Sequence, residues 1–321
     1  MIAADASEGT LASLRGRLMA DRTWAVLLLV PSMLAIGIFV YGFIGWTGYV
    51  SLSRWRGVVP DYTFVGDDNY VRLSRNLRFQ ADIRNTIVFT ALFLFAATVL
   101  GLAAALLLDQ KIKAEGLFRS VFLFPMAISF IVTGIAWQWL FNPTTGVNLL
   151  ARKTGYDGPL PRWLTDPDIL FGFRVGQIEA GIPIALIPLV IAATWQLAGF
   201  TMAMYLAGIR GVSEELREAA RVDGATEWQV YRRVVLPLLA PVTLSVLVIL
   251  GHISLKIFDL VVAMAGSGPG FATDMPAFYM FEATFRGNQF AIGAAIAMVL
   301  LFLVATVVVP YLYYSLRREG R

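Results

Sequence analysis

Six apolar stretches, each long enough to cross a lipid bilayer as a helix, constrain this chain more than any other feature of its sequence. They lie at about Trp24–Trp46, Ile83–Leu108, Phe118–Phe141, Ile182–Ile209, Leu236–Met264 and Phe290–Tyr314. A helix needs roughly 20 apolar residues to span the hydrocarbon core. Of the 321 residues, 58% are hydrophobic and 15% are charged, whereas soluble domains carry about 25% charged residues. We therefore predict an all-α integral membrane protein with six transmembrane helices.

Scarce residue types exclude several kinds of site. The chain has no cysteine and a single histidine, His252, which excludes disulfide frameworks, zinc ribbons, iron–sulfur clusters, cysteine catalysis and sites built from several histidines. We therefore predict no metal site. The net charge of +4 is dispersed along the chain, so we also predict no nucleic-acid partner. Because no nucleophile lies at a recognisable spacing from a base, we predict that the chain is not an enzyme.

The distribution of basic residues predicts the orientation in the membrane. The first stretch is too long for a signal peptide, so we expect it to be retained, and six spans then place both termini on one side. Segments on that side contain 14 Lys and Arg residues, against 11 in the longer segments opposite, which makes the terminal side cytoplasmic. We divide the chain into a cytoplasmic segment 1–23, a six-span domain 24–314 and a cytoplasmic tail 315–321. The short inner loop from Asp109 to Glu115 is expected to be solvated.

A charged segment between the fourth and fifth spans, residues 210–235, is patterned as two short helices. Ser213 is placed to cap the first helix, and glutamates in its first turn suit the positive end of the helix dipole. Glu218 and Arg221 are spaced i,i+3 and can form an ion pair. Gly224 fits the left-handed position that ends a helix.

The second helix of this segment is predicted to run from Glu227 to Val235. Thr226 and Gln229 match a capping box at its start, and Pro237 marks the return to the membrane. A plain surface linker is one interpretation of the two helices. Because helix connections in bundles usually need only about 2–8 residues, we favour the other interpretation, a docking element on the cytoplasmic face.

The same segment carries a motif. Glu218-Ala219-Ala220 is followed by Gly224 and then by Val234-x-Leu236-Pro237. This pattern resembles the EAA signature of the membrane subunits of ATP-binding-cassette (ABC) importers, with Val234 where isoleucine is usual. Further matches extend over nearly the whole chain and resemble the maltose-type sugar permeases: Phe64-Val65-Gly66-x-x-Asn69-Tyr70, Asn85-Thr86, Phe122-x-x-Pro125, Trp137-Gln138-Trp139, Phe258-Asp259 and Phe290–Ala295. The run Val132–Pro143 most resembles permeases for glucose, mannose or α-glucosides.

This resemblance implies a fold, partners and a membrane. It implies the type I ABC importer permease fold in a bacterial or archaeal cytoplasmic membrane. Two permease subunits, most often different chains, would work on two ATPase subunits and receive sugar from an extracytoplasmic binding protein. The chain lacks the G-x-x-x-x-G-K-[ST] phosphate loop, so ATP and Mg²⁺ would be bound by the ATPase and no cofactor by this chain. The residues implied to contact the ATPase are Leu216, Glu218, Ala219, Ala220, Arg221, Asp223 and Gly224.

Polar side chains inside the spans are candidates for a substrate path, because such groups are costly in lipid. A sugar path combines hydrogen-bonding groups with flat aromatic faces. The candidates are Gln138, Trp195, Gln196, His252, Lys256 and Asp259. Lys256 and Asp259, spaced i,i+3, could instead be a packing pair, and His252 could bond a neighbouring helix.

Two functions remain open at this point. The first is a permease subunit of an ATP-driven sugar importer, which forms half of a pathway and couples to the ATPase through residues 210–235. The second is an ion-coupled secondary transporter that works without an ATPase through His252, Lys256 and Asp259.

Overall fold

The computed structural model describes residues 26–110 and 113–319, which are helical apart from one two-stranded hairpin. The predicted segment 1–23 lies outside these residues, as do positions 111 and 112 of the inner loop and the last two residues of the tail. The elements of the first half are η1 (Gly37–Gly42), α2 (Phe43–Ser51), α3 (Asp68–Ser74), α4 (Leu77–Asp109), α5 (Glu115–Leu123), η2 (Phe124–Ala127), α6 (Phe130–Leu140), α7 (Gly146–Lys153) and η3 (Trp163–Thr165).

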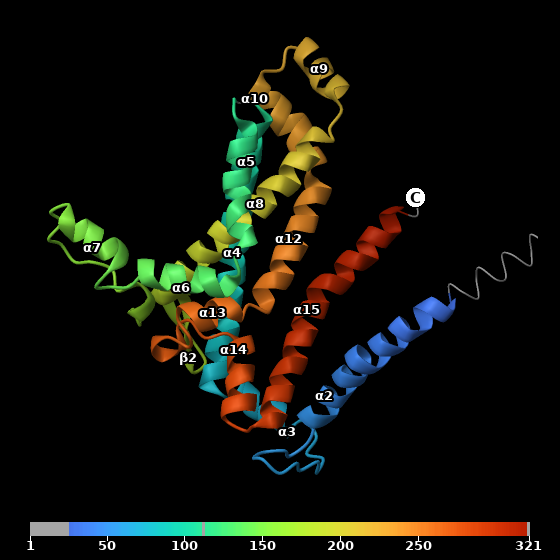
Figure 1. Cartoon of the computed structure of the whole chain (residues 1–321), viewed down its shortest axis with the longest axis vertical. Coiled ribbons are helices and arrows are strands. Elements are labelled where there is room, and N and C mark those ends of the chain that lie inside the picture. The colour runs from blue at the N-terminus through green and yellow to red at the C-terminus, as the bar shows by residue number, and fades with distance from the viewer. Residues whose placement is uncertain (1–25, 111–112, 320–321) are drawn as a thin grey trace, which may run out of the picture.

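The second half begins with the hairpin and continues as helices. Its elements are β1 (Ile169–Val175), β2 (Ile178–Pro183), η4 (Ile184–Leu186), α8 (Ile187–Arg210), α9 (Glu214–Val222), α10 (Glu227–Val230), η5 (Tyr231–Val235), α11 (Leu236–Leu238), α12 (Ala240–Leu255), α13 (Asp259–Met264), η6 (Pro269–Phe271), α14 (Pro276–Phe281), η7 (Glu282–Arg286) and α15 (Phe290–Glu319). Figure 1 shows α9 and α10 at one end of the molecule and α3 and α14 near the other.

The six apolar stretches form four continuous helices and two bent ones. Helices over Val26–Ser51, Leu77–Asp109, Ile184–Arg210 and Phe290–Tyr313 are long and apolar enough to cross a membrane. The third stretch bends by 98° between η2 and α6, and the fifth by 61° between α11 and α12. The fifth is interrupted again between α12 and α13. The prediction of six apolar spans is confirmed, but two of them are broken helices rather than straight ones.

Close helix packing builds the core around α4 and α8. The side chains of Phe89, Phe93 and Tyr205 are fully or almost fully buried there. Two glycines let backbones approach: a Cβ on Gly101 would lie 2.5 Å from Cβ of Thr201, and one on Gly199 would overlap the carbonyl of Phe122. Small residues at such crossings are the usual device for packing helices in lipid.

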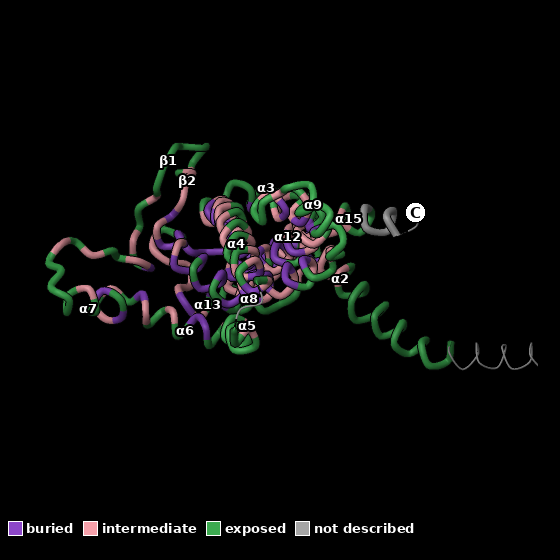
Figure 2. Tube along the Cα trace, turned by 90° about the horizontal axis from the view of Figure 1, so that it is seen from above, coloured by how far each residue is buried: buried purple, intermediate pink, exposed green. Residues whose placement is uncertain are grey.

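Two parts of the chain project from this core. None of the most apolar window of the helix Val26–Ser51 is buried within the chain: its last part, α2, packs against α15, whereas residues 26–42 project away from the other helices (Figure 2). On the opposite side, α7 and the antiparallel strands β1 and β2 project, with exposed Phe171 and Phe173 on β1. This hairpin is an addition to the all-α prediction.

Gly199 provides a test of the packing between α8 and the end of α5. Replacing Gly199 with alanine should lower the stability of the folded protein by about 1–3 kcal/mol, because the new methyl group collides with backbone and not with a flexible side chain. Gly45→Ala is the matched control, since nothing lies within 4 Å of a Cβ at that helical position. Thermal unfolding in detergent measures both, and equal melting temperatures would contradict the packing described.

Candidate functional site

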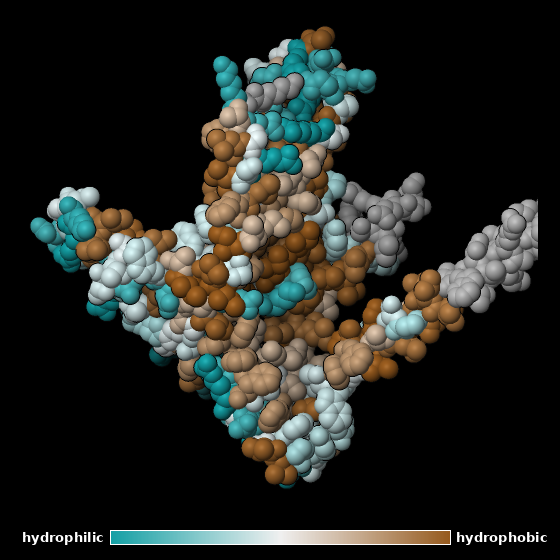
Figure 3. Space-filling model, in the orientation of Figure 1, coloured by the Kyte–Doolittle hydropathy of each residue, from teal (hydrophilic) through white to brown (hydrophobic). Residues whose placement is uncertain are grey.

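The end of the molecule that carries α9 and α10 has a polar surface. Hydrophilic residues gather over these helices, whereas hydrophobic residues cover the middle of the molecule (Figure 3). We call residues 213–235 the α9–α10 hairpin. It stands over a cavity of about 990 Å³ that also borders the cytoplasm-facing ends of α4, α5 and α8 in the predicted orientation.

The turn of the α9–α10 hairpin has the predicted geometry. Gly224 has a φ of +83°, and its N–H donates to the carbonyl of Arg221 at 3.0 Å. The N–H of Ala225 donates to the carbonyl of Ala220 at 3.0 Å, which completes a Schellman motif. Thr226 and Gln229 form both bonds of the capping box. At the other end of α9 Ser213 is the N-cap residue, but its side chain makes no capping hydrogen bond among the described residues.

The ion pair expected between Glu218 and Arg221 does not form. Arg221 instead donates to Glu227 at 2.7 Å and to Glu214 at 2.9 Å, so it joins the two helices of the hairpin. The hydrogen bond to Glu227, and after it the one to Glu214, raises the pKa of Arg221 above its ordinary value. The prediction counted spacing along one helix, whereas the turn at Gly224 brings an acid of the next helix within reach. Glu218 is exposed and makes no ion pair within the described part of the chain.

Arg217, which the sequence analysis did not single out, anchors α9 to the membrane helices. Its side chain is almost buried and donates to Asp109 at the end of α4 at 3.0 Å and to the carbonyl of Ile209 near the end of α8 at 2.5 Å. The hydroxyl of Tyr231 on η5 donates to the same Asp109 oxygen at 2.7 Å. The expectation that Asp109 belongs to a solvated loop is therefore wrong: it ends α4 and is the shared partner of residues from α9 and η5.

The remaining coupling candidates form an exposed surface on the hairpin. Glu218, Ala219, Asp223 and Gly224 are exposed, Ala220 is half-buried, and Leu216 is 50% exposed. Two large apolar side chains that the motif does not include, Val222 at 86% and Trp228 at 65%, are even more exposed. An apolar surface of this kind on a charged hairpin is typical of a docking site.

The side chains of the first three substrate-path candidates have three different environments. Gln196 is buried on α8, and its amide donates to the carbonyl of Ile128 at 2.7 Å. Trp195 contacts the ring of Trp137 at 5.8 Å and lines an apolar groove of about 920 Å³. Gln138 is exposed on α6.

The other three candidates lie at the break between α12 and α13. His252 is half-buried on the last turn of α12, and its buried Nδ1 has no hydrogen-bond partner in the part of the chain that the structure describes. Lys256 is the C-cap residue of α12, and Asp259 begins α13. Both side chains are exposed, and no ion pair joins them, because the helix ends before the i,i+3 geometry can form.

The anchor at Arg217 can be tested by its effect on α9. In Arg217→Gln the bonds to Asp109 and the Ile209 carbonyl lose their charge, so amides of α9 should exchange with deuterium at least several-fold faster. Arg221→Gln is the control, because it removes exposed ion pairs of low stabilising value. Hydrogen exchange measured by mass spectrometry checks this, and unchanged protection of α9 in Arg217→Gln would contradict the anchor.

Comparisons with known proteins agree with this architecture. Residues 97–319 match the family described as binding-protein-dependent transport system inner membrane component. The chain is 41% identical over 302 residues to a probable ABC transporter permease protein of Pyrococcus horikoshii, a match that covers 94% of this chain and 98% of the relative. It is 34% identical to the xylose/arabinose import permease protein XacH of Haloferax volcanii, over 91% of this chain and 87% of the relative.

A solved structure has the same fold. It is a bacterial ABC transporter involved in the import of the acidic polysaccharide alginate, with a TM-score of 0.74 and 23% identity over 94% of this chain and 99% of that chain. The predicted resemblance is confirmed by the family match, and no finding favours a transporter that works without an ATPase. The chain belongs to the binding-protein-dependent transport system inner membrane components and is a multi-pass membrane permease of the ABC class.

Proposed function

We propose that this chain is a permease subunit of an ATP-driven sugar importer and forms one half of the translocation pathway. The observation that carries the proposal is the exposed α9–α10 hairpin, joined through Arg217 to the ends of α4 and α8. The family description supports binding-protein-dependent transport, and the name of the Haloferax relative, a xylose/arabinose import permease, supports import of a sugar. The substrate class is a monosaccharide such as glucose or mannose, or a small α-glucoside.

The importer would contain three further kinds of protein. A separate ATPase subunit would bind ATP and Mg²⁺ and receive the exposed face of α9, with Leu216, Glu218 and Ala219 at the contact. A second permease subunit would complete the pathway, and an extracytoplasmic protein would deliver the sugar. In this arrangement the hairpin and both termini face the cytoplasm of a bacterial or archaeal cell.

The anchor supplies a route for the motion of the ATPase. When the ATPase closes, it would move α9, and the charge-assisted bonds of Arg217 would pass the movement to Asp109 on α4 and to the end of α8. Because α4 and α8 pack closely, they would shift as a unit. Such a shift would change which side of the membrane the pathway opens to.

The substrate path is proposed at the break between α12 and α13. Lys256 and Asp259 are exposed charges without an ion pair to each other, and one turn away the buried Nδ1 of His252 has no partner among the residues that the structure describes. Such groups can bond sugar hydroxyls, and their cost in lipid favours a position that faces a polar path. Gln138, Trp195 and Gln196 would shape the path from α6 and α8.

Purification and transport test the proposal. Gentle purification from native membranes should recover an ATPase, a second permease and a sugar-binding protein with this chain. In liposomes the complex should import sugar with ATP, and Gly224→Pro should abolish uptake while the protein remains inserted, because proline cannot adopt the left-handed turn. Gly155→Pro is the matched control. Gly155 has a φ of +87°, and its N–H donates to the carbonyl of Arg152 at 3.0 Å, in the loop that follows α7.

The outcome separates the two functions weighed from the sequence. Uptake that persists in Gly224→Pro, or sugar transport by the chain alone without ATP, would contradict the importer. Loss of uptake in Gly155→Pro as well would assign the effect to general misfolding.

Lys256 tests the substrate path. Lys256→Gln should raise the sugar concentration needed for half-maximal uptake by at least several-fold, because an amide bonds hydroxyls less strongly than an ammonium group. Lys153→Gln on the projecting helix α7 is the control for loss of one exposed charge. Uptake measured over a range of sugar concentrations checks this, and identical curves for both variants would remove Lys256 from the path.

A further inference from the structure

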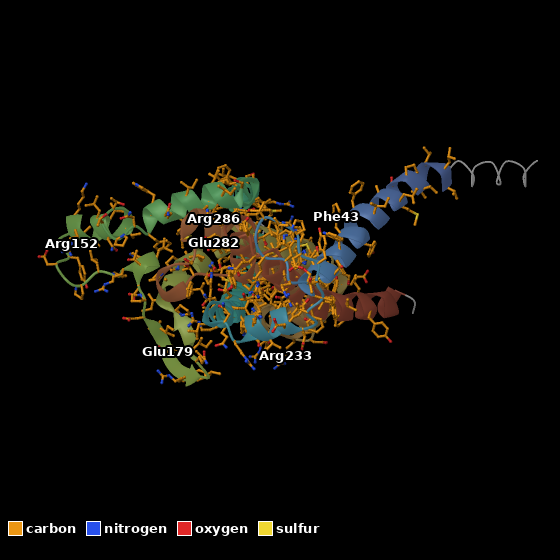
Figure 4. The ribbon with its side chains drawn as sticks, turned by 90° about the horizontal axis from the view of Figure 1, so that it is seen from below. Phe43, Arg152, Glu179, Arg233, Glu282 and Arg286 are labelled. Carbon is orange, nitrogen blue, oxygen red and sulfur yellow. The ribbon has the colours of Figure 1, made fainter. Side chains whose placement is uncertain are left out.

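The end of the molecule opposite the α9–α10 hairpin holds a buried charged cluster. Arg78, in the first turn of α4, donates through Nε to Asp274 at 2.5 Å and through Nη2 to Glu282 at 2.6 Å. Its guanidinium also lies 4.4 Å from the ring centre of Tyr279. Glu282 accepts a second bond from Arg286 at 2.9 Å, and the two residues lie close together when the molecule is seen from below (Figure 4).

Asp82, one turn further along α4, is the unusual member of this cluster. Its side chain is fully buried, and neither carboxylate oxygen has a hydrogen-bond donor among the described residues. It lies one turn from Arg78 and one turn from Asn85 on α4, and both of these residues bond to Asp274, which is also fully buried. Both Asp274 oxygens are already occupied, one by Arg78 and the other by the backbone N–H of Met275 at 3.0 Å.

The charged neighbours do not neutralise Asp82 by direct contact. Arg78 donates through Nε to Asp274 and through Nη2 to Glu282, and Arg84 donates to the side chain of Asn85 and to the carbonyl of Glu179. The other titratable groups that face the site are Tyr279 and Glu282. An ionised carboxylate buried without a donor is strongly destabilising, and two adjacent carboxylates that are both ionised repel each other as well.

A metal ion does not account for the arrangement. No group of three His, Cys, Asp or Glu side chains able to bind a metal occurs in the described ranges, and the guanidinium of Arg78 would repel a cation placed beside Asp274. A proton needs neither space nor further ligands. It turns one carboxyl of a facing pair into a donor for the other, as in coupled carboxyl dyads.

We propose that Asp82 and Asp274 form a buried proton-binding site, in which Asp82 carries the proton and donates it in a hydrogen bond to ionised Asp274. Asp274 is the ionised member because Arg78 and the Met275 N–H both bond to its charged form. The bond fastens the loop 266–275 to α4, together with the amide of Asn85, which donates to the carbonyls of Phe271 and Asp274 at 2.7 and 2.8 Å. Because this loop follows α13 directly, the site holds the outer end of α13 in place.

Substitutions at Asp82 test the site. Asp82→Asn keeps the shape of a protonated carboxyl and can donate to Asp274, so it should melt at or above the temperature of the unchanged protein near neutral pH. Asp82→Ala leaves a cavity and an unpaired Asp274, and should melt several degrees lower. Equal destabilisation by both variants would overturn the proposal and favour an ionised Asp82.

The pH dependence gives a second, independent readout. If Asp82 takes up a proton on folding, raising the pH destabilises the unchanged protein relative to Asp82→Asn, by up to about tenfold in the unfolding equilibrium constant per pH unit. Asp68→Asn, which removes an exposed carboxylate paired with Arg72, is the control and should not produce this slope. Parallel pH profiles for the unchanged protein and Asp82→Asn would overturn the proposal.

Infrared spectroscopy identifies the proton directly. The absorption of a protonated aspartic acid should be present in the unchanged protein and absent from Asp82→Asn. If no such band is found, and added sodium or calcium ions raise the melting temperature of the unchanged protein alone, the pair binds a cation instead. None of these measurements requires transport, so they stand or fall independently of the proposed function.

Discussion

In a bilayer every backbone N–H and C=O must find a partner within the protein, and this constraint explains why a polar side chain is placed beside a broken span. The bend between η2 and α6 leaves the carbonyl of Ile128 outside any helix, and the amide of Gln196 donates to it. At the bend before α12, Thr243 donates to the carbonyl of Leu239 and accepts from the hydroxyl of Tyr205. Gln196 thus satisfies a carbonyl that the bend leaves outside the helix, whereas the Leu239 carbonyl at the second bend also accepts from the backbone N–H of Thr243 at 2.8 Å.

Helix α4 connects the two charged clusters of the molecule. It begins beside Asp274, where Arg78 and Asp82 contact the loop 266–275, and it ends at Asp109, where Arg217 and Tyr231 meet. Between these ends it packs on α8 through Gly101 with no room for an added methyl group. In the proposed mechanism, a displacement at one end would be carried along this closely packed helix to the elements bonded to its other end.

The local features of the chain could be predicted from the sequence, and the long-range ones could not. Apolar length predicts the spans, and the spacing of Gly224, Thr226 and Gln229 predicts the turn of the hairpin, because each depends on residues close together in the chain. Arg217 and Asp109 are 108 residues apart, and Arg78 and Asp274 are 196 apart. Which charge meets which depends on the packing of helices that no local pattern encodes.

The contrast between local spacing and the folded structure also explains why Lys256 and Asp259 do not form the ion pair that their spacing allows. Spacing of i,i+3 makes an ion pair only if the helix continues between the two residues, and α12 ends at Leu255. The break turns two charges that could have cancelled within one helix into separate exposed groups, one at the C-terminal end of α12 and one at the N-terminal end of α13. A cation beside a helix C-terminus and an anion beside an N-terminus are each stabilised by the helix dipole. The break therefore leaves two opposite charges exposed at adjacent helix ends without an ion pair between them.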